Sequence, residues 1–277
     1  MILRDLPLTS FNSAGSRDSP LTNHGVLQAK RLGAHLATLP GDIGPVKSIF
    51  SSNLQRAYRT AEAVAEAIAR PQPSVNDSSE TQTPLNVVQL VELREKDFGS
   101  TEGKKFGSRA AESDGDARSD AETRDVMKTR IERFIDVHLA PILDRHVSEK
   151  VTVVVVAHGI ILGVLLRTLL SQYPAQQSDS LYQHGEVVAT WSNTGVVQVK
   201  MEPATKCKPS SLADSSVDPL EPQQDLRAVI DFINNVDHLQ GLKKTRGGIG
   251  SAKFDSKQRT MDSFFGPAAK KRKLGER

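Results

Sequence analysis

Cysteine, aromatic residues and long apolar runs are scarce in this sequence. The single cysteine, Cys207, excludes an intrachain disulfide and a cysteine zinc cluster, and it fits a reducing compartment. Aromatic residues account for 5% of the chain, so a core must be built from Leu, Val, Ile and Ala. No apolar run approaches the roughly 20 residues of a membrane-spanning helix, and the first residues lack the apolar centre of a secretion signal. We therefore expect no membrane partner.

Positive charge is concentrated near the carboxyl terminus. Residues 241–277 contain 11 Lys and Arg against 3 Asp and Glu, whereas the body of the chain has an acidic excess. This tail has little to bury, so we expect it to be disordered and to bind an acidic partner, an import receptor or nucleic acid.

The segment before the tail has two parts. The composition of residues 203–225 predicts a Ser/Pro/Asp linker. Residues 226–240 have apolar positions at helical spacing and predict a short amphipathic helix.

β-Branched residues dominate residues 151–159, VTVVVVAHG, which are followed by the apolar segment 160–170. Such a run suits a strand covered on both faces, and the segment after it suits a helix. His158 would then stand at the carboxyl end of a strand, where ligands bind in open α/β sheets. A core histidine that only caps a turn fits the same pattern, so both interpretations remain open at this point.

The chain up to residue 202 alternates between strand and helix patterns. Thr22 can cap one helix, and Ser52 with Gln55 forms a capping-box pattern for another. We expect strands at 46–50, 86–90 and 151–157, helices at 22–39, 52–70, 126–143 and 160–170, and a hairpin of 186–191 with 196–201. Residues 2–8 hold apolar residues for a further short strand, but Pro7 interrupts it. The alternation predicts an α/β fold.

Three chemically distinct side chains follow predicted strands. Arg56 lies in the first turn of a helix, where a forked guanidinium and the helix amino terminus both favour an anion. Glu95 stands in a loop dense in acidic residues and glycine, and His158 ends the 151–157 strand. An arginine that holds a phosphoryl group, a carboxyl that donates a proton and a histidine that stabilises charge would suit phosphate ester chemistry. Each residue alone is also compatible with an ordinary structural role.

Four segments in order resemble the histidine phosphatase superfamily, the phosphoglycerate mutase-like proteins. DSPLTNHGVLQA (18–29) matches the family pattern D-x-P-L-T-x-x-G-x-x-Q-A, and SSNLQRAYRTA (51–61) matches S-x-L-x-R-A-x-x-T-A. LREKDFGSTEG (93–103) matches L-x-E-x-x-x-G-x-x-x-G, and AHG (157–159) matches the second histidine motif. The resemblance covers residues 14–200 and implies a three-layer α/β sandwich with a mostly parallel sheet flanked by helices. We therefore expect a family domain over residues 1–202.

The resemblance also implies roles for residues at matching positions. Arg56 matches the phosphate-binding arginine, Glu95 the proton donor and His158 the second histidine of the pocket, while Gly15 is a backbone contact to the phosphate. The implied substrate is a phosphorylated small molecule or a phosphoprotein. Mutases and phosphatases share these motifs, so the reaction stays open between them. No metal or organic cofactor is implied.

The sequence departs from the family at its start. The family begins with a strand ending in Arg-His-Gly, whose histidine is the nucleophile that becomes a phosphohistidine, and no Arg-His-Gly occurs in this chain. The first strand is therefore missing or replaced, which would leave its neighbours in the sheet without a partner. Either the coding start was misassigned and a first exon is absent, which we favour, or the protein is a diverged pseudoenzyme. As written, the chain is expected to have no phosphohistidine chemistry.

The tail contains a second motif. QRTMDSFF (258–265) resembles the PIP box that binds the replication sliding clamp, the proliferating cell nuclear antigen. One helical turn would bring three apolar side chains to the same side, with an amide at the edge. The anchors would be Gln258, Met261, Phe264 and Phe265. A chance match of a short motif is the alternative, and so is a non-catalytic domain that serves clamp binding.

A cluster of basic residues follows the clamp-like motif. KKRK (270–273) resembles a monopartite nuclear-import signal, formed by Lys270, Lys271, Arg272 and Lys273. An import receptor is then a further partner, and we expect the protein in the nucleus, with the cytoplasm as a second location. Direct contact with nucleic acid ranks last among the hypotheses, because the tail offers no base-stacking surface besides its two phenylalanines.

Overall fold

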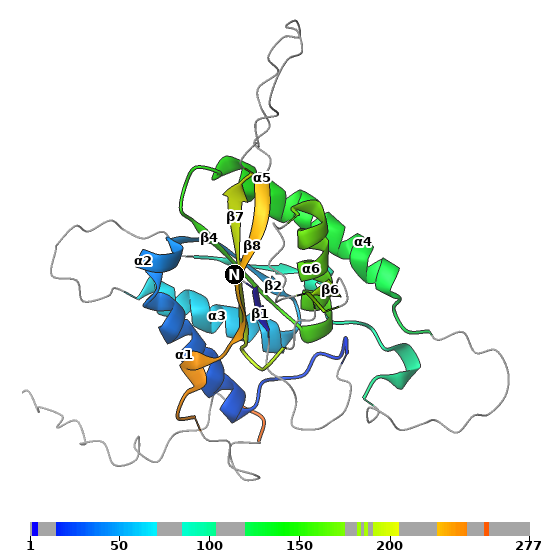
Figure 1. Ribbon diagram of the computed structural model, residues 1–277. Coiled ribbons are helices and arrows are strands. Elements are labelled where there is room, and N and C mark those ends of the chain that lie inside the picture. Colours follow the sequence, from blue (N-terminus) through cyan, green and yellow to red (C-terminus); the bar gives the residue numbers. More distant parts are fainter. Residues whose placement is uncertain are drawn as a thin grey trace, which may run out of the picture.

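A computed structural model of the chain describes residues 2–4, 15–70, 85–103, 120–174, 182–183, 186–187, 191–204, 226–242 and 252–254 (Figure 1). The clamp-like motif at 258–265 and the basic cluster at 270–273 lie outside the described residues, as does most of the linker at 203–225.

The described chain is organised around one six-stranded sheet with the order β3-β2-β4-β1-β7-β8. The strands are β1 (Ile2–Arg4), β2 (Val46–Ser52), β3 (Val87–Leu90), β4 (Thr152–Ala157), β7 (Val196–Pro203) and β8 (Leu226–Asn235). The strands from β3 to β1 are parallel, whereas β7 and β8 are antiparallel to their neighbours. A separate small ribbon joins β5 (Tyr182–Gln183) to β6 (Glu186–Val187). The predicted α/β fold with a mostly parallel sheet is confirmed.

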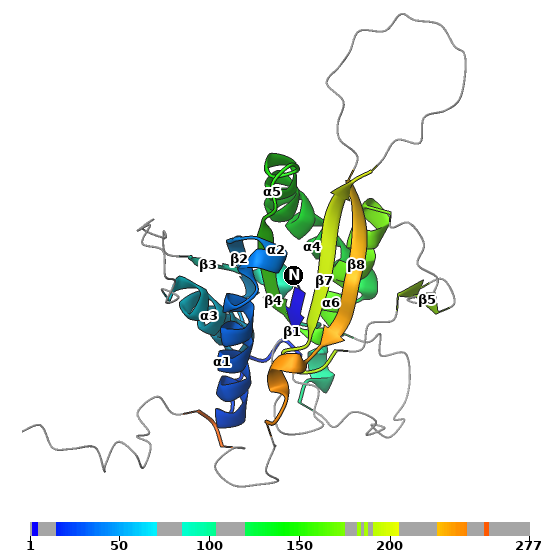
Figure 2. The same ribbon diagram turned by 60° about the vertical axis from the view of Figure 1, so that its left-hand side comes forward.

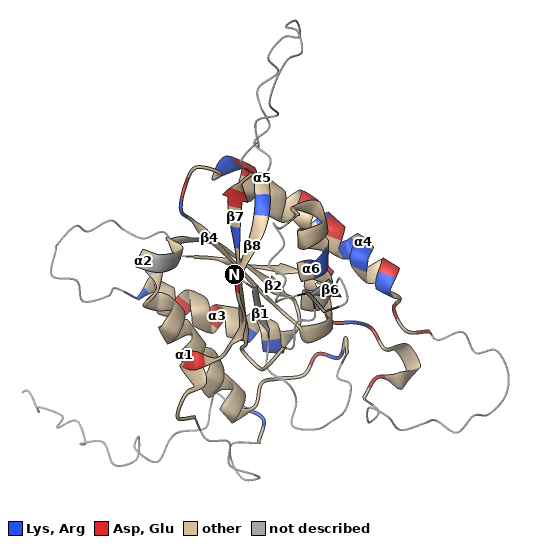
Figure 3. Cartoon of the chain, in the orientation of Figure 1, with Lys and Arg blue, Asp and Glu red and all other residues tan. Residues whose placement is uncertain are grey.

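Helices cover both faces of the sheet (Figure 1). The α-helices are α1 (Asn23–Ala37), α2 (Pro40–Ile43), α3 (Gln55–Ala69), α4 (Arg124–Phe134), α5 (Ala140–Arg145) and α6 (Gly159–Gln172), and the shorter helices are η1 (Val91–Leu93), η2 (Gly99–Thr101), η3 (Ile135–Leu139) and η4 (Asp237–Leu239). Side chains of α1 and α3 form one core with one face of β2 and β4, and side chains of α4 and α6 form a second core on the other face. Charged residues follow the exposed surface of helices such as α4 (Figure 3). These layers are the three-layer sandwich that the resemblance implied.

The helix starts follow local capping chemistry, with one correction. Thr22 caps α1 as predicted, because its hydroxyl accepts a hydrogen bond from the Gly25 N–H at 3.1 Å. The capping box of Ser52 and Gln55 is wrong. Asp18 accepts the Gln55 N–H at 2.7 Å instead, so a distant loop supplies the carboxylate at the start of α3.

The position of the first strand is occupied by β1. It pairs with β4 on one side and with β7 on the other, and the register places Arg4 opposite Ala157. Because β1 has three residues, it occupies only the part of the sheet next to the carboxyl end of β4.

Two predictions for the carboxyl-terminal part of the domain are wrong. Residues 226–235 form β8, because they pair with β7 along its length and their apolar residues at 226, 228, 230 and 232 also fit a strand period. The expected hairpin is absent from the described residues, since β6 pairs with β5 and β7 pairs with β1 and β8. Figure 2 shows β7 and β8 side by side.

The compact domain therefore extends beyond residue 202. After β8, helix η4 packs on α1, where Arg31 donates to the Gln240 carbonyl at 2.8 Å and the His35 and His238 rings stack at 5.9 Å. Residues 252–254 then return to the start of α1, since Thr22 pairs with Lys253.

Candidate functional site

The predicted site residues gather at the carboxyl edge of the parallel strands. Arg56 follows β2, Glu95 follows β3 and the short helix η1, and His158 follows β4 directly. β2 is the neighbour of both β3 and β4 in the sheet, so the three residues leave the sheet at the same edge, as the topology of a parallel sheet requires.

His158 is held between two strand ends. Its side chain is only 1% exposed, and its Nε2 lies 2.8 Å from Oγ of Ser52 at the end of β2. The Ser52 hydroxyl also accepts the Leu54 N–H at 3.2 Å. This chain of contacts fixes the imidazole against the start of α3, the helix that carries Arg56.

Glu95 sits on the amino terminus of α6. Its two carboxylate oxygens accept the N–H groups of Ile160 and Ile161, each at 3.2 Å, and one of them also accepts the Lys96 N–H at 2.9 Å. Free N–H groups and the helix dipole favour an anion at this place. Because α6 begins directly after His158, these bonds hold the Glu95 carboxylate within three residues of His158 at the same edge of the sheet.

Arg56 is buried and grips the loop that precedes α1. It is 4% exposed, and its guanidinium donates to the carbonyls of Arg17 and Gly15 at 2.7 and 2.9 Å. Gly15 has φ +49°, and a Cβ there would clash with a carboxylate oxygen of Glu102. The loop therefore requires glycine both for its backbone conformation and for the approach of Glu102.

Two arginines that the sequence analysis did not select tie the Glu95 loop to its surroundings. Arg94 donates to the Ser16 carbonyl at 3.0 Å, and its Nε is buried without a hydrogen-bond partner among the described residues. Arg130 on α4 forms a fork with the Glu122 carboxylate at 2.7 and 2.9 Å and donates to the Glu92 and Arg94 carbonyls at 2.5 and 2.7 Å.

The contacts of Arg94 and Arg130 could not be predicted from the sequence. The position of Arg94 next to Glu95 in the sequence could have marked it as a site residue. The segment is so dense in charged residues, however, that this position alone does not distinguish Arg94. Arg130 lies in an amphipathic helix with several other arginines and lysines. Its role depends on a loop 35 to 38 residues away, which only the tertiary structure reveals.

The edge combines a buried guanidinium, a carboxylate on a helix amino terminus and a buried imidazole. Such groups can hold an anion and exchange a proton with it. Within the described residues, no group of three His, Cys, Asp or Glu side chains is arranged to hold a metal ion. None of the described helices combines the length and apolarity that crossing a bilayer requires.

Known proteins with similar sequences carry phosphatase and mutase descriptions. A probable phosphatase from Schizosaccharomyces pombe is 28% identical over 255 residues, which cover 91% of this chain and 73% of that protein. The uncharacterized phosphatase PhoE from Bacillus subtilis is 27% identical over 167 residues, covering 60% of this chain and 73% of its own length.

Solved structures support the same fold. A mycobacterial glucosyl-3-phosphoglycerate phosphatase superposes with a TM-score of 0.56 at 21% identity and covers 84% of this chain and 96% of its own. A phosphoglycerate mutase from Bacillus anthracis has a TM-score of 0.56 at 20% identity, covering 86% of this chain and 93% of its own. At this identity the likeness concerns the fold.

The family model of the histidine phosphatase superfamily (branch 1) matches residues 8–202. This span includes the loop at Gly15, the strand ends that carry the three site residues, and all of β7 except its last residue. With most of the chain matched and Arg56, Glu95 and His158 gathered at one edge of the sheet, this chain belongs to the histidine phosphatase superfamily.

Proposed function

We propose that the carboxyl edge of the sheet binds the phosphoryl group of a phosphate monoester, in a small molecule or a phosphoprotein. The observation that carries this proposal is the convergence of a buried Arg56, a buried His158 and the Glu95 carboxylate on the first N–H groups of α6. Arg56 and His158 supply donors for phosphoryl oxygens, and Glu95 is the proposed proton donor to the ester oxygen.

We further propose that this chain binds its ligand without forming a phosphohistidine. The family's Arg-His-Gly does not occur in the sequence, and Arg4 at the end of β1 is followed by Asp5 and Leu6. The register of β1 supports a comparison with the family motif, because Arg4 pairs with Ala157, the residue before His158. Asp5 itself lies outside the described residues. A phosphohistidine needs an imidazole nucleophile, and the sequence has no histidine directly after Arg4.

Binding can be tested on the purified full-length chain by calorimetric titration with p-nitrophenyl phosphate. Arg56→Lys keeps a positive charge but loses the fork, and it should weaken binding at least tenfold. Arg59→Lys is the matched control, because Arg59 lies on the same helix with a side chain that is 61% exposed. Equal affinities of the two variants, both folded by circular dichroism, would refute the phosphate-binding proposal.

Catalysis is tested separately by release of p-nitrophenol. The unmodified chain should release no more p-nitrophenol than the His158→Ala variant. The double substitution Asp5→His and Leu6→Gly completes Arg-His-Gly after β1 and should create measurable hydrolysis with an acid-labile phosphoenzyme. Turnover by the unmodified chain that exceeds the control would contradict the proposed inactivity.

A second function, binding of the replication sliding clamp through residues 258–265, is favoured by one observation. The Phe254 N–H donates to the Leu21 carbonyl at 3.0 Å and the Asn23 N–H to the Ala252 carbonyl at 3.1 Å, so the chain is anchored on the domain shortly before the motif. The motif would then be presented beside the phosphatase-like domain. Gln258, Met261, Phe264 and Phe265 are the proposed anchors.

The test is titration of purified proliferating cell nuclear antigen with the full chain. Replacing Phe264 and Phe265 by Ala should abolish binding, whereas replacing Phe254 by Ala should leave the motif intact. Nuclear import through Lys270–Lys273 is tested by the location of a fluorescent fusion in which these residues are changed to Ala. A nuclear signal that survives this change would exclude them as the import determinant.

A further inference from the structure

The end of the described chain returns to the start of α1. Residues 252–254, which we call the docking segment, lie beside the amino end of this helix (Figure 2). Lys253 forms an antiparallel bridge with Thr22, the residue that caps α1. The docking segment is therefore paired with the part of the chain that connects the candidate site to α1.

Two backbone hydrogen bonds hold the docking segment on the domain. The Asn23 N–H donates to the Ala252 carbonyl at 3.1 Å, and the Phe254 N–H donates to the Leu21 carbonyl at 3.0 Å. The Phe254 side chain adds little burial, since it is 46% exposed. Two such bonds contribute a small free energy, so the docking segment can separate from the domain in a local opening that leaves the core folded.

Contacts further along α1 limit this opening to the docking segment. Arg31 on α1 donates to the Gln240 carbonyl at 2.8 Å, and the His35 and His238 rings stack at 5.9 Å. These contacts lie toward the carboxyl end of α1, away from the bridge at Thr22. Separation of the docking segment therefore leaves β8 and η4 in place.

The docking segment meets the chain close to the loop that Arg56 holds. Asp18 fixes this loop on α3, because its carboxylate accepts the Gln55 N–H at 2.7 Å. Two residues, one of them Pro20, separate Asp18 from Leu21. Proline fixes its own φ and restricts the residue before it, so this connection is short and stiff. A shift of Leu21 is therefore transmitted to Asp18.

Leu21 also contacts the helix that carries Arg56. Its side chain is 6% exposed and packs with Ala29 of α1 and Ala63 of α3. Its carbonyl accepts the hydrogen bond from the docking segment. One residue thus joins the docking segment, both helices and the loop before α1.

We propose that docking of residues 252–254 regulates the candidate site. The docked segment holds the loop of residues 15–18 in the form that binds a phosphate ester, and separation of the segment releases this loop. The regulation rests on the proposed phosphate-binding function. A ligand that prefers the docked form shifts the chain toward it. Linkage then requires that bound phosphate ester tightens docking by the same factor by which docking tightens phosphate binding.

The test removes each hydrogen bond of the docking segment separately in the full chain. Phe254→Pro lacks the N–H that donates to Leu21, and Asn23→Pro lacks the N–H that donates to Ala252. Asn23 is the first residue of α1, where proline is well tolerated. Each proline variant should bind p-nitrophenyl phosphate about fivefold more weakly in calorimetry. Phe254→Ala and Asn23→Ala keep the N–H groups, so these matched controls should bind like the unmodified chain.

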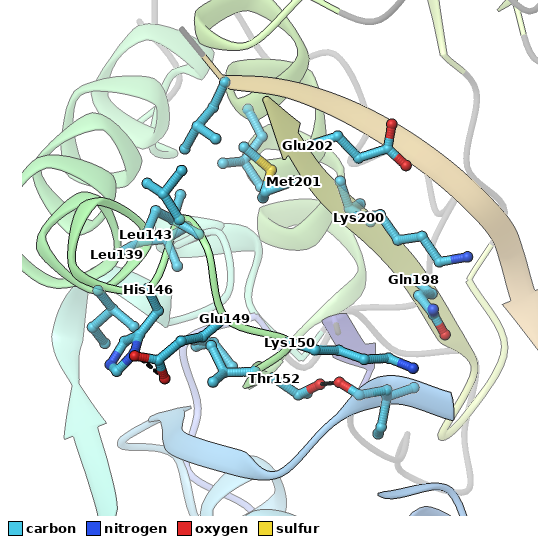
Figure 4. A pocket seen from close by; sticks show the side chains of 18 of the residues that line it. Leu139, Leu143, His146, Glu149, Lys150, Thr152, Gln198, Lys200, Met201 and Glu202 are labelled. Carbon is cyan, nitrogen blue, oxygen red and sulfur yellow. Dashed lines mark hydrogen bonds and ion pairs between the residues drawn. The ribbon is translucent and has the colours of Figure 1, made fainter. Parts of the chain in front are cut away.

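Hydrogen exchange supplies an independent readout. Saturating p-nitrophenyl phosphate should slow exchange of the Phe254 N–H in the unmodified chain about fivefold, and Asn23→Pro should accelerate it. The Thr152 N–H is the reference group. It donates to the Pro45 carbonyl at 2.9 Å, and Thr152 lines a cavity of about 290 Å³ at the amino end of β4, away from the docking segment (Figure 4). Its exchange should not change.

Three results would overturn the regulation. Equal affinities of the proline and alanine variants at both positions would do so while leaving phosphate binding in place. Tighter binding by the proline variants would mean that the docking segment obstructs the site. Faster exchange of the Thr152 N–H in these variants would mean that they loosen the whole domain. Absence of binding by the unmodified chain would instead refute the proposed function, and the regulation with it.

Discussion

The two ends of strand β4 differ sharply in how they are packed. At the carboxyl end, Val156, Ala157 and His158 are each at most 1% exposed, and hydrogen bonds join this end to β2 and to the Glu95 loop. At the amino end, Thr152 and Val153 border a cavity. The difference arises because β1 reaches only the carboxyl half of β4. The candidate site therefore lies at the more tightly packed end of β4, where contacts to β2 and to the Glu95 loop hold its side chains.

The largest effect on stability is expected from Arg130→Met, which removes the hydrogen bonds that hold the Glu95 loop on α4. The substitution leaves the Glu122 carboxylate and the carbonyls of Glu92 and Arg94 without their shared donor. Loss of one partner of a largely buried ion pair should lower the free energy of unfolding by about 3 kcal/mol. Urea denaturation measures this loss, and phosphate ester binding should weaken with it.

Lys128→Met is the control for Arg130. Lys128 lies on the same helix and forms an exposed pair with Glu132 at 3.4 Å, so its loss should cost at most about 0.5 kcal/mol. If both variants had the same stability and affinity, Arg130 would not organise the loop.

A matched pair of substitutions on β4 compares its two ends directly. Val156 is fully buried, and phenylalanine there should cost about 2 kcal/mol by overpacking. Val153 lines the cavity, so phenylalanine should be accommodated with a change of less than about 1 kcal/mol. Thermal unfolding of the two variants measures the difference. Equal losses would show that the amino end of β4 is as tightly packed as its carboxyl end.

Gly15→Ala tests the loop beneath Arg56. The new methyl group would meet the Glu102 carboxylate, and φ of +49° disfavours any residue with a Cβ. We expect a loss of about 1–2 kcal/mol and weaker binding of phosphate ester. Gly41→Ala is the control, because a Cβ at Gly41 meets nothing within 4 Å. Loss of binding in the control as well would remove the special role of Gly15.

The smallest expected effect is a pH dependence of the folding stability, caused by His238 in the segment after β8. Burial, together with the neighbouring His35 and Arg31, lowers the pKa of His238 to about 4 against the opposing effect of Asp237. An unfolded histidine takes up its proton near pH 6.5. The neutral ring therefore stabilises the folded chain above pH 6.5, and this contribution is lost as the pH falls from about 6.5 to 4.

Because His238 is only half-buried, the loss should be roughly 1 kcal/mol. Denaturant titrations at pH 7 and pH 4.5 should show it, and His238→Gln should reduce the difference between the two pH values. An unchanged pH dependence in the variant would assign the effect to other groups.

Local patterns predicted most of the elements because their signals were short-range. The β-branched run at 152–157, the Thr22 cap and the helical spacing of α3 are all readable within about 15 residues. The arrangement of Arg56, Glu95 and His158 followed from family motifs combined with parallel topology. Contacts across the chain were not readable, such as Asp18 at the start of α3 or Arg130 on the Glu95 loop.

The β8 error has a specific physical cause. Residues 226–235 contain apolar residues at both helical and strand spacing, so periodicity alone could not separate the two. The free edge of β7 decided the outcome, because pairing with β8 covers it along its length. Tertiary context of this kind is invisible in a local window.

The most direct test of the central claim is a crystal of the full chain soaked with tungstate, which mimics phosphate and is located by its anomalous signal. We predict one strong site at the carboxyl edge of the sheet, within hydrogen-bond distance of the Arg56 guanidinium and the His158 imidazole. Tungstate bound only elsewhere on the molecule, with this edge empty at saturating concentration, would contradict the claim that the edge holds a phosphoryl group.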